Sequence, residues 1–240
     1  MPTIVITGTR SGLSLEHVRQ LSQDPSNTII ALVRSLTSGD LSALRSVQSS
    51  ATGTVHILEC DTSSPPSIAG LSDRIKAASP TTTTIDVLIN NAAILQHKPE
   101  TSLNLSPEAF VSHMSTNVLG PALTLSALLP MLAKDAKVVN ITSGLGSLEL
   151  LSNGTIGVEA THYSLSKAAL NMLTVHQARQ VSKGVVVVCL DPGYAKTEMG
   201  GPGATTEPEE SVAGTLKVIR GLREEDAVRF FLFRGEGLPW

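Results

Sequence analysis

The strongest constraint on the fold is a regular alternation between short runs rich in Val and Ile and longer amphipathic stretches. The short runs are almost continuously apolar, which is typical of strands buried on both faces of a parallel sheet. We expect seven strands, in the runs Thr3–Thr7, Thr28–Val33, Val55–Cys60, Ile85–Asn90, Lys137–Ile141, Val185–Leu190 and Arg229–Phe233.

The stretches between these runs have helical spacing. Ser106 followed by Pro107 is a good helix start, with the serine as cap and the proline at the first helical position. Strand–helix alternation with right-handed crossovers predicts an α/β fold, a doubly wound parallel sheet of Rossmann type with helices on both faces. We expect one domain over residues 1–240, with helices at about 12–23, 38–49, 65–79, 106–133, 161–182 and 208–221.

Composition excludes several classes of function. A net charge of −3 and 3% aromatic residues argue against a nucleic-acid partner. No apolar stretch approaches the ~18 residues that a membrane span needs, and the N-terminus has no signal-like pattern. We therefore expect a soluble, cytoplasmic protein in which Cys60 and Cys189 are buried free thiols. The histidines lack ligand spacing, so we expect no metal site.

A glycine-rich turn follows the first expected strand. It reads Thr7-Gly8-Thr9-Arg10-Ser11-Gly12, and a helix begins after it. Glycine permits the tight turn and lets the backbone approach a pyrophosphate, while the helix N-terminus favours the anion. Gly8 and Gly12 therefore predict a dinucleotide site, although a tight turn without a ligand would have the same pattern.

Two arginines refine the expected cofactor. Arg10 lies inside the glycine turn, and Arg34 ends the second strand, where an acidic residue would bind the ribose of NAD. A guanidinium group suits a 2′-phosphate instead, so the pair favours NADP(H). The alternative is that both arginines are solvated surface residues.

The sharpest local feature is Tyr163 followed by Lys167. Residues four apart share a helix face, so both side chains could reach one cleft. A nearby cation favours the phenolate, and we expect Lys167 to lower the pKa of Tyr163 from its ordinary value near ~10. Such a tuned hydroxyl can act as a general acid. Taken alone, this pair is common and usually structural.

Together with the other motifs, this pair resembles the short-chain dehydrogenase/reductase family over essentially the whole chain. The C-terminal run Phe230–Trp240 and the segment Lys196–Pro202 resemble the C-factor and sniffer-like carbonyl reductase branch. The motifs that carry the family resemblance, in the family's order, are Gly8 and Gly12, Cys60-Asp61, Asn90–Ala93, Asn117, Ser143, Tyr163 with Lys167, and Asp191–Gly193.

The resemblance implies catalytic roles for four residues. Tyr163 would protonate a carbonyl oxygen, and Ser143 would hydrogen-bond the same oxygen. Lys167 would bind the nicotinamide ribose, and Asn117 would hold a water in a proton relay to Lys167. As alternatives, Asn117 could merely interrupt a helix, and Thr142, Ser147 or Ser152 could take the role of Ser143.

The resemblance also implies which residues hold NADP(H). Asp61 would contact the adenine, although it could equally cap the following helix. The remaining cofactor contacts implied by the resemblance are Leu13, Asn91, Ala92, Tyr163, Lys167, Pro192, Gly193, Ala195 and Thr197.

The chain departs from the family pattern in three places. Ser14 replaces the third glycine of the turn, Ala93 stands where the family usually has glycine, and Ser143 and Tyr163 lie 20 residues apart, more than in the commonest members. We interpret the extra length, about 144–160, as an apolar lip over the substrate pocket, carrying Leu145, Leu148, Leu150 and Leu151. Packing of these leucines against the body is the alternative. We expect about 194–207 to be a mobile loop, and His162 to be a partly exposed helix-start residue.

These expectations converge on an NADPH-dependent oxidoreductase that reduces a ketone or aldehyde, a small-molecule carbonyl, to an alcohol. A non-redox isomerase or cyclase, or an NADP-binding regulatory protein, would fit the same fold. The resemblance also implies that a homodimer or homotetramer could form through the two long helices at 106–133 and 161–182.

Overall fold

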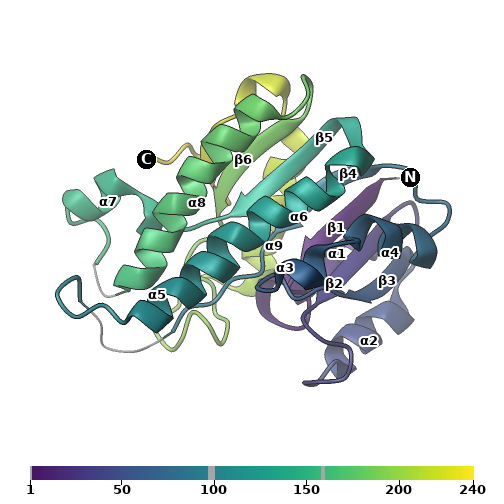
Figure 1. Ribbon diagram of the computed structural model, residues 1–240, viewed down its shortest axis with the longest axis horizontal. Helices are drawn as coiled ribbons and strands as arrows, with labels where there is room; N and C mark the ends of the chain where they lie inside the picture. Colours follow the sequence, from purple (N-terminus) through teal and green to yellow (C-terminus); the bar gives the residue numbers. More distant parts are fainter. Residues whose placement is uncertain (1, 97–100, 158–159) are drawn as a thin grey trace.

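The computed structural model describes residues 2–96, 101–157 and 160–240. Its centre is a seven-stranded sheet in the order β3-β2-β1-β4-β5-β6-β7 (Figure 1). All neighbouring strands pair in parallel, which confirms the predicted doubly wound α/β fold. The strands are β1 (Thr3–Thr7), β2 (Thr28–Val33), β3 (Thr54–Glu59), β4 (Ile85–Asn90), β5 (Leu132–Ile141), β6 (Val186–Asp191) and β7 (Phe230–Leu232).

Helices cover both faces of the sheet (Figure 1). Side chains from α1 (Gly12–Leu21), α2 (Ser42–Ser50) and α9 (Pro208–Gly221) join one hydrophobic core. The second core includes side chains from the helices of the opposite face. That face carries α3 (Pro65–Ile68), α4 (Leu71–Ala78), α5 (Pro107–Met114), α6 (Gly120–Leu128) and α8 (Thr161–Gln180).

The strand sequences explain why there are two cores. In β1, Ile4 and Ile6 belong to the first core and Val5 to the second, because successive side chains point to opposite faces. All three are at most 3% exposed. A strand buried on both sides must be apolar at every position, which is the pattern that made these strands predictable.

Two predicted helices differ from the observed ones. The stretch 65–79 is divided into α3 and α4 at Gly70, whose φ of 69° lies in the left-handed region. The stretch 106–133 contains a π-helical segment, Ser115–Leu119, and gives way to β5 at Leu132. Ser106 caps α5 as predicted, because its side chain accepts a hydrogen bond from the amide of Ala109. None of the described helices is long and apolar enough to cross a membrane.

The strand order reverses between β1 and β4, which lie side by side although β2 and β3 separate them in sequence. A crevice forms at the carboxyl ends of the strands at such a point. The Thr7 hydroxyl holds these two ends together by accepting hydrogen bonds from the amides of Asn91 (3.0 Å) and Ala92 (2.9 Å).

Polar side chains link the centre of the sheet to α8. Asn90 on β4 donates to Asn140 on β5, and the Asn140 amide donates to Thr174 and Gln177 on α8, at distances from 2.8 to 2.9 Å. These groups are buried, so their hydrogen bonds offset the cost of removing them from water. This network fixes α8, which carries Tyr163 and Lys167, against the sheet.

Candidate active site

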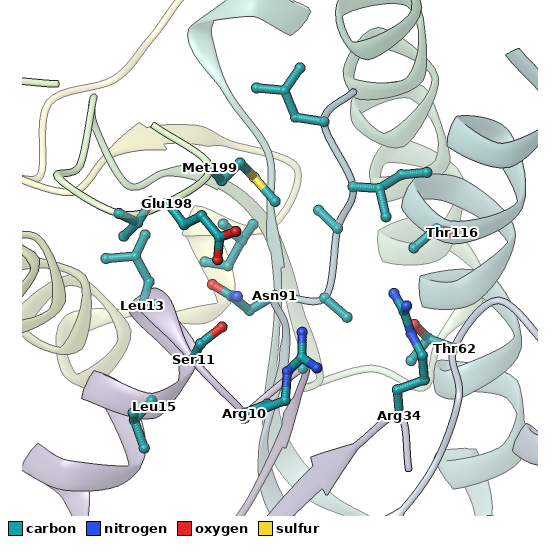
Figure 2. Close-up of a pocket in the computed structure, with 18 of the residues that line it drawn as sticks. Arg10, Ser11, Leu13, Leu15, Arg34, Thr62, Asn91, Thr116, Glu198 and Met199 are labelled. Atoms are coloured by element: carbon teal, nitrogen blue, oxygen red, sulfur yellow. The ribbon is translucent and has the colours of Figure 1, made fainter. Parts of the chain in front are cut away.

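A cavity of about 990 Å³ opens at the carboxyl ends of β1, β2 and β4 and extends to the start of α8. This volume is at the upper end of the range for small-molecule sites. Figure 2 shows part of the lining, which comes from segments far apart in the sequence. The predicted residues that line it are Gly8, Arg10, Gly12, Leu13, Arg34, Asp61, Asn91, Ala92, Tyr163, Lys167, Pro192 and Thr197.

Four predicted site residues are not part of this lining: Asn117, Ser143, Gly193 and Ala195. Ala195 is 6% exposed and belongs to the packed base of the 194–207 segment. That segment is closed by backbone hydrogen bonds, since the Tyr194 carbonyl accepts the amides of Thr205 and Thr206 at 2.9 Å. The mobility of this segment stays a prediction.

The glycine turn has the backbone geometry that a phosphate cradle needs. Gly8 has a φ of 75°, and a Cβ there would lie 2.9 Å from the Cα of Ala92. Gly12 also has a left-handed φ, of 60°. Ser14, in place of the third glycine, is fully buried and donates its hydroxyl proton to the Thr7 carbonyl at 3.0 Å. The serine therefore fits the packing and adds a bond within the turn.

The chemistry of the cavity fits a phosphorylated dinucleotide. Figure 2 shows the Arg10 and Arg34 side chains extending into the cavity. Guanidinium groups bind phosphate through charge-assisted hydrogen bonds. Asp61 lines the same cavity and accepts hydrogen bonds from the amide and hydroxyl of Ser63. Because the cap of α3 is Ser64, the interpretation of Asp61 as a helix cap is wrong.

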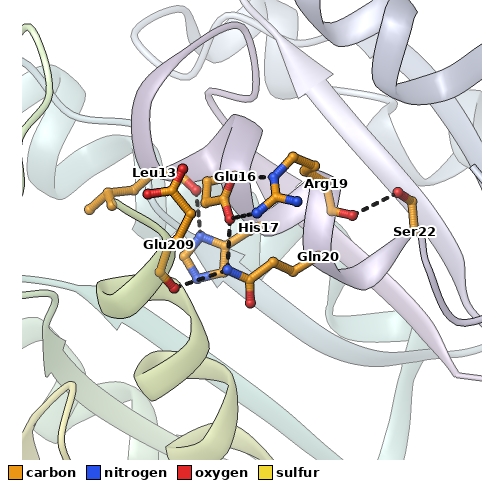
Figure 3. Close-up of polar contacts among 7 residues, drawn as sticks. All are labelled: Leu13, Glu16, His17, Arg19, Gln20, Ser22 and Glu209. Atoms are coloured by element: carbon orange, nitrogen blue, oxygen red, sulfur yellow. Dashed lines mark hydrogen bonds and ion pairs between the residues drawn. The ribbon is translucent and has the colours of Figure 1, made fainter. Parts of the chain in front are cut away.

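A polar cluster that the sequence did not reveal lies on α1, which follows the turn, and reaches α9 (Figure 3). The Nδ1 atom of His17 lies 2.7 Å from the Leu13 carbonyl, and burial lowers the pKa of His17 to about 4. Glu16 forms an ion pair with Arg19. Gln20 hydrogen-bonds to Glu16 and to the Glu209 carbonyl on α9. These contacts join α1 to α9 beside the turn.

Tyr163 and Lys167 are buried on one face of α8, as their spacing predicts. The Lys167 ammonium lies 5.3 Å from the centre of the Tyr163 ring and donates to the Ile141 carbonyl at 2.8 Å. Burial lowers the pKa of Lys167 to about 8. Burial, together with the Asp191 carboxylate, raises the pKa of Tyr163. The expectation that the pKa of Tyr163 is lowered is therefore wrong.

Asn117 lies within the π-helical segment and is fully buried. Its amide bonds both backbone groups of Ile94 and the hydroxyl of Ser166, at 2.8 to 3.0 Å. The side chain thus ties the strand-end segment after β4 to α8. Since these bonds occupy the amide, a water held by this side chain stays a prediction without support from its contacts.

Ser143 begins the expected lip. Its hydroxyl accepts the Leu145 amide at 3.2 Å, in a short turn that leads to α7 (Leu148–Ser152). A Cβ at Gly144 would lie 2.7 Å from Ile156, so the segment packs closely over the end of β5. Leu148, in contrast, is 77% exposed. The apolar side chains of the segment are therefore divided between packing and solvent.

His162 differs from its prediction, because it is 1% exposed rather than partly exposed. Its ring stacks on that of His113, with centroids 5.8 Å apart. A local pattern at a helix start could not reveal this contact between α8 and α5. Cys60 and Cys189 are buried free thiols, as predicted. Among the described residues, no three or more His, Cys, Asp or Glu side chains gather as a metal ion would require.

Known proteins resemble this chain along its length. Residues 2–208 match the family described as short chain dehydrogenase. A short-chain dehydrogenase/reductase of Aspergillus aculeatus, AacuF, is 32% identical over 95% of this chain and 90% of its own. The C-signal protein of Myxococcus xanthus is 40% identical over 65% of this chain and 93% of its own.

Solved structures agree with these relatives. An NADPH-bound carbonyl reductase from chicken fatty liver superposes with a TM-score of 0.89 at 30% identity, covering 100% of this chain and 99% of the other. The carbonyl reductase Sniffer of D. melanogaster superposes with a TM-score of 0.89 at 26% identity, covering 100% of both chains.

The doubly wound sheet, the glycine turn at its switch point and the buried Tyr163 and Lys167 define a Rossmann-type protein with a tyrosine at the cavity wall. With the matches above, the chain belongs to the short-chain dehydrogenase/reductase family.

Proposed function

We propose that this protein is an NADPH-dependent reductase that converts a ketone or aldehyde to an alcohol, with Tyr163 as the proton donor. The observation that carries the proposal is one cavity whose lining includes the glycine turn, two arginines and the Tyr163–Lys167 pair. The NADPH-bound and carbonyl reductase neighbours support the same chemistry.

Different residues of the cavity would bind different parts of NADPH. Gly8, Gly12 and Leu13 would surround the pyrophosphate, and Arg10 and Arg34 would bind the 2′-phosphate. Asp61, Asn91 and Ala92 would contact the adenosine, while Pro192 and Thr197 would border the nicotinamide. Gly193 and Ala195 would shape the Pro192–Thr197 segment from beneath, since neither lines the cavity.

The cofactor would supply a hydride when bound. Tyr163 then donates its proton to the carbonyl oxygen, so that the carbon gains hydrogen, the oxygen becomes a hydroxyl, and the tyrosine is left as a phenolate. Lys167, whose ammonium lies 5.3 Å from the centre of the Tyr163 ring, would hold a positive charge near this phenolate. The family resemblance is what supports a hydrogen bond from Ser143 to the carbonyl oxygen, since Ser143 stands at the end of β5 outside the cavity lining.

The part of the substrate away from the carbonyl would lie near the segment 145–157, which follows Ser143. In the structure, Ile156 and Leu150 of this segment pack beside Gly144, and no residue of 143–157 lines the cavity.

The test is turnover of NADPH with a panel of aldehydes, ketones and quinones. We expect loss of the reduced-nicotinamide absorbance with at least one substrate, and a fall of about 1,000-fold in kcat for Tyr163→Phe. The matched control is Tyr194→Phe, because Tyr194 is the other tyrosine of the chain and is 53% exposed. Tight NADPH binding without turnover on the whole panel would contradict the proposal and favour a binding protein or a non-redox enzyme.

A further inference from the structure

We propose that Gly39 is a positioning residue that sets the preference for NADPH over NADH, because its missing side chain leaves the space in which the Arg10 guanidinium lies. This inference rests on the function proposed above, in which Arg10 and Arg34 bind the 2′-phosphate. Gly39 belongs to the loop 34–41 between β2 and α2, and no motif in the sequence singled it out.

The Arg10 side chain lies across Gly39. A Cβ placed on Gly39 would be 2.5 Å from the Nη1 atom of Arg10, 3.5 Å from its Cδ and 3.6 Å from its Cζ. These are the three heavy atoms nearest to that position, and all of them belong to Arg10. The guanidinium is therefore the first group that a side chain at position 39 would meet.

Gly39 matters for Arg10 because no polar contact fixes the guanidinium. The Arg10 side chain forms no hydrogen bond or ion pair with the residues that the structure describes. It nevertheless extends into the cavity, as the Arg34 side chain does (Figure 2). Ser35 and Ser38, from the same loop as Gly39, line this cavity as well. The place of the guanidinium beside the loop therefore depends on packing against Gly39.

The loop is held on both sides of its glycine. Before Gly39, the amide of Leu36 donates to the carboxylate of Glu59 at the end of β3, at 2.8 Å. After it, the carboxylate of Asp40 accepts the amide of Ser42 at the start of α2, also at 2.8 Å. A methyl group added to the glycine should therefore displace the flexible end of the arginine rather than the loop.

The displacement is large enough to affect phosphate binding. Non-bonded heavy atoms pack about 3.5 Å or more apart, so the Arg10 Nη1 atom would have to move by roughly 1 Å. Charge-assisted hydrogen bonds to phosphate span about 2.7–2.9 Å, so a shift of this size would break one. NADH carries a hydroxyl in place of the 2′-phosphate and depends less on the guanidinium. A side chain at position 39 should therefore reduce selectivity rather than cofactor binding in general.

The experiment measures binding of NADP⁺ and NAD⁺ by isothermal titration calorimetry, which needs no turnover. We expect Gly39→Ala to weaken NADP⁺ binding about fivefold and to leave NAD⁺ binding unchanged. Gly39 is exposed, so the variant should fold, and thermal unfolding checks this.

The matched control is Gly70→Ala. Gly70 has a φ of 69°, against 83° for Gly39, and its Cβ would lie 3.8 Å from the Nη1 atom of Arg74, which is an ordinary contact. This variant has a similar backbone strain and should bind both cofactors as the wild type does.

A double-mutant cycle separates the positioning role from a general effect on the loop. Arg10→Ser should weaken NADP⁺ binding about fivefold or more, and adding Gly39→Ala should weaken it no further, because no guanidinium remains to be displaced. A loss caused by Gly39→Ala that persists in the Arg10→Ser background would overturn the proposal, since the glycine would then act through the loop.

The remaining outcomes distinguish this inference from the proposed function. If the wild type prefers NADP⁺ and Gly39→Ala keeps that preference, the inference fails and the proposed function stands. If the wild type binds NADP⁺ and NAD⁺ equally well, the assignment of NADPH in the proposed function fails, and the inference fails with it.

Discussion

The two sides of the cavity are built by different means. On the side of β1 and β2, backbone geometry does most of the positioning, through the left-handed Gly8 and Gly12. On the side of β5, β6 and α8, buried polar side chains do it, among them Asn140 and Lys167. The first side must leave room for a large ligand, whereas the second must hold a few side-chain atoms in fixed places.

The comparison shows which functional groups lower the stability of the folded chain. A glycine turn costs backbone entropy and little else. A buried lysine costs the hydration of its charge, and Lys167 has a carbonyl partner but no carboxylate partner at hydrogen-bond distance among the described contacts. The catalytic side should therefore gain stability when its functional groups are removed, whereas the turn should lose stability when its glycines are replaced.

The largest expected effect follows from Lys167→Met. Its activity should fall about 1,000-fold, since the charge beside Tyr163 is lost. Its free energy of unfolding near pH 7 should exceed that of the wild type by up to about 3 kcal/mol, because a pKa near 8 in the folded state lies far below the unfolded value. Urea unfolding measures this difference.

The stability difference between Lys167→Met and the wild type should also depend on pH. Between about pH 8 and the unfolded pKa near 10.4, the unfolded chain binds the Lys167 proton and the folded chain does not, so wild-type stability rises with pH. The advantage of Lys167→Met should shrink across this window. Lys183→Met, at an exposed site, is the control and should show no such change. A variant less stable than wild type at every pH would contradict the comparison.

His17 is the corresponding buried base on the glycine-turn side, and its effect has the same pH direction in a more acidic window. Its pKa of about 4 in the folded state lies below the unfolded value near 6.5, so wild-type stability should fall by up to about 3 kcal/mol as pH falls through this window. His17→Asn keeps a donor near the Leu13 carbonyl and cannot titrate, so it should lose less stability in acid.

Thermal unfolding at several pH values measures this effect. The control is His176→Asn, since His176 is exposed on α8. An acid sensitivity that is equal in wild type and His17→Asn would show that His17 is not the group responsible.

The smallest of these effects concerns the turn itself. Gly8→Ala should destabilise the chain by about 2 kcal/mol, because alanine is strained at a φ of 75° and its Cβ would approach Ala92 too closely. Gly154→Ala is a matched control, since Gly154 has a φ of 77° and nothing within 4 Å of its Cβ position. Both variants carry the conformational cost, so the difference between their unfolding free energies reports the contact with Ala92.

The parts of the molecule that could be predicted from sequence depend on local pattern. Continuous runs such as Val185–Leu190 identify strands, since any strand buried on both faces must be apolar throughout. Gly8 and Gly12 identify the turn because its left-handed backbone conformation favours glycine. Even the capping of α5 by Ser106 follows from neighbouring residues.

What could not be predicted depends on contacts between distant elements. The break at Gly70 and the π-helical segment around Asn117 reflect packing that a periodic pattern does not contain. The burial of His162 depends on His113, and the raised pKa of Tyr163 depends on burial and on Asp191, which is 28 residues away in sequence. These features arise when the chain folds and brings polar groups out of water.

The most direct test of the division between the two sides is a steady-state comparison of Tyr163→Phe with the double variant Arg10→Ser, Arg34→Ser. We predict that Tyr163→Phe, which keeps the aromatic ring, weakens NADPH binding by less than about tenfold and loses about 1,000-fold in kcat, while the arginine variant raises the NADPH KM about tenfold or more, loses preference over NADH, and keeps its kcat at saturating cofactor. A fall in kcat for the arginine variant at saturation, or NADPH binding by Tyr163→Phe that is weakened as much as its kcat, would contradict it.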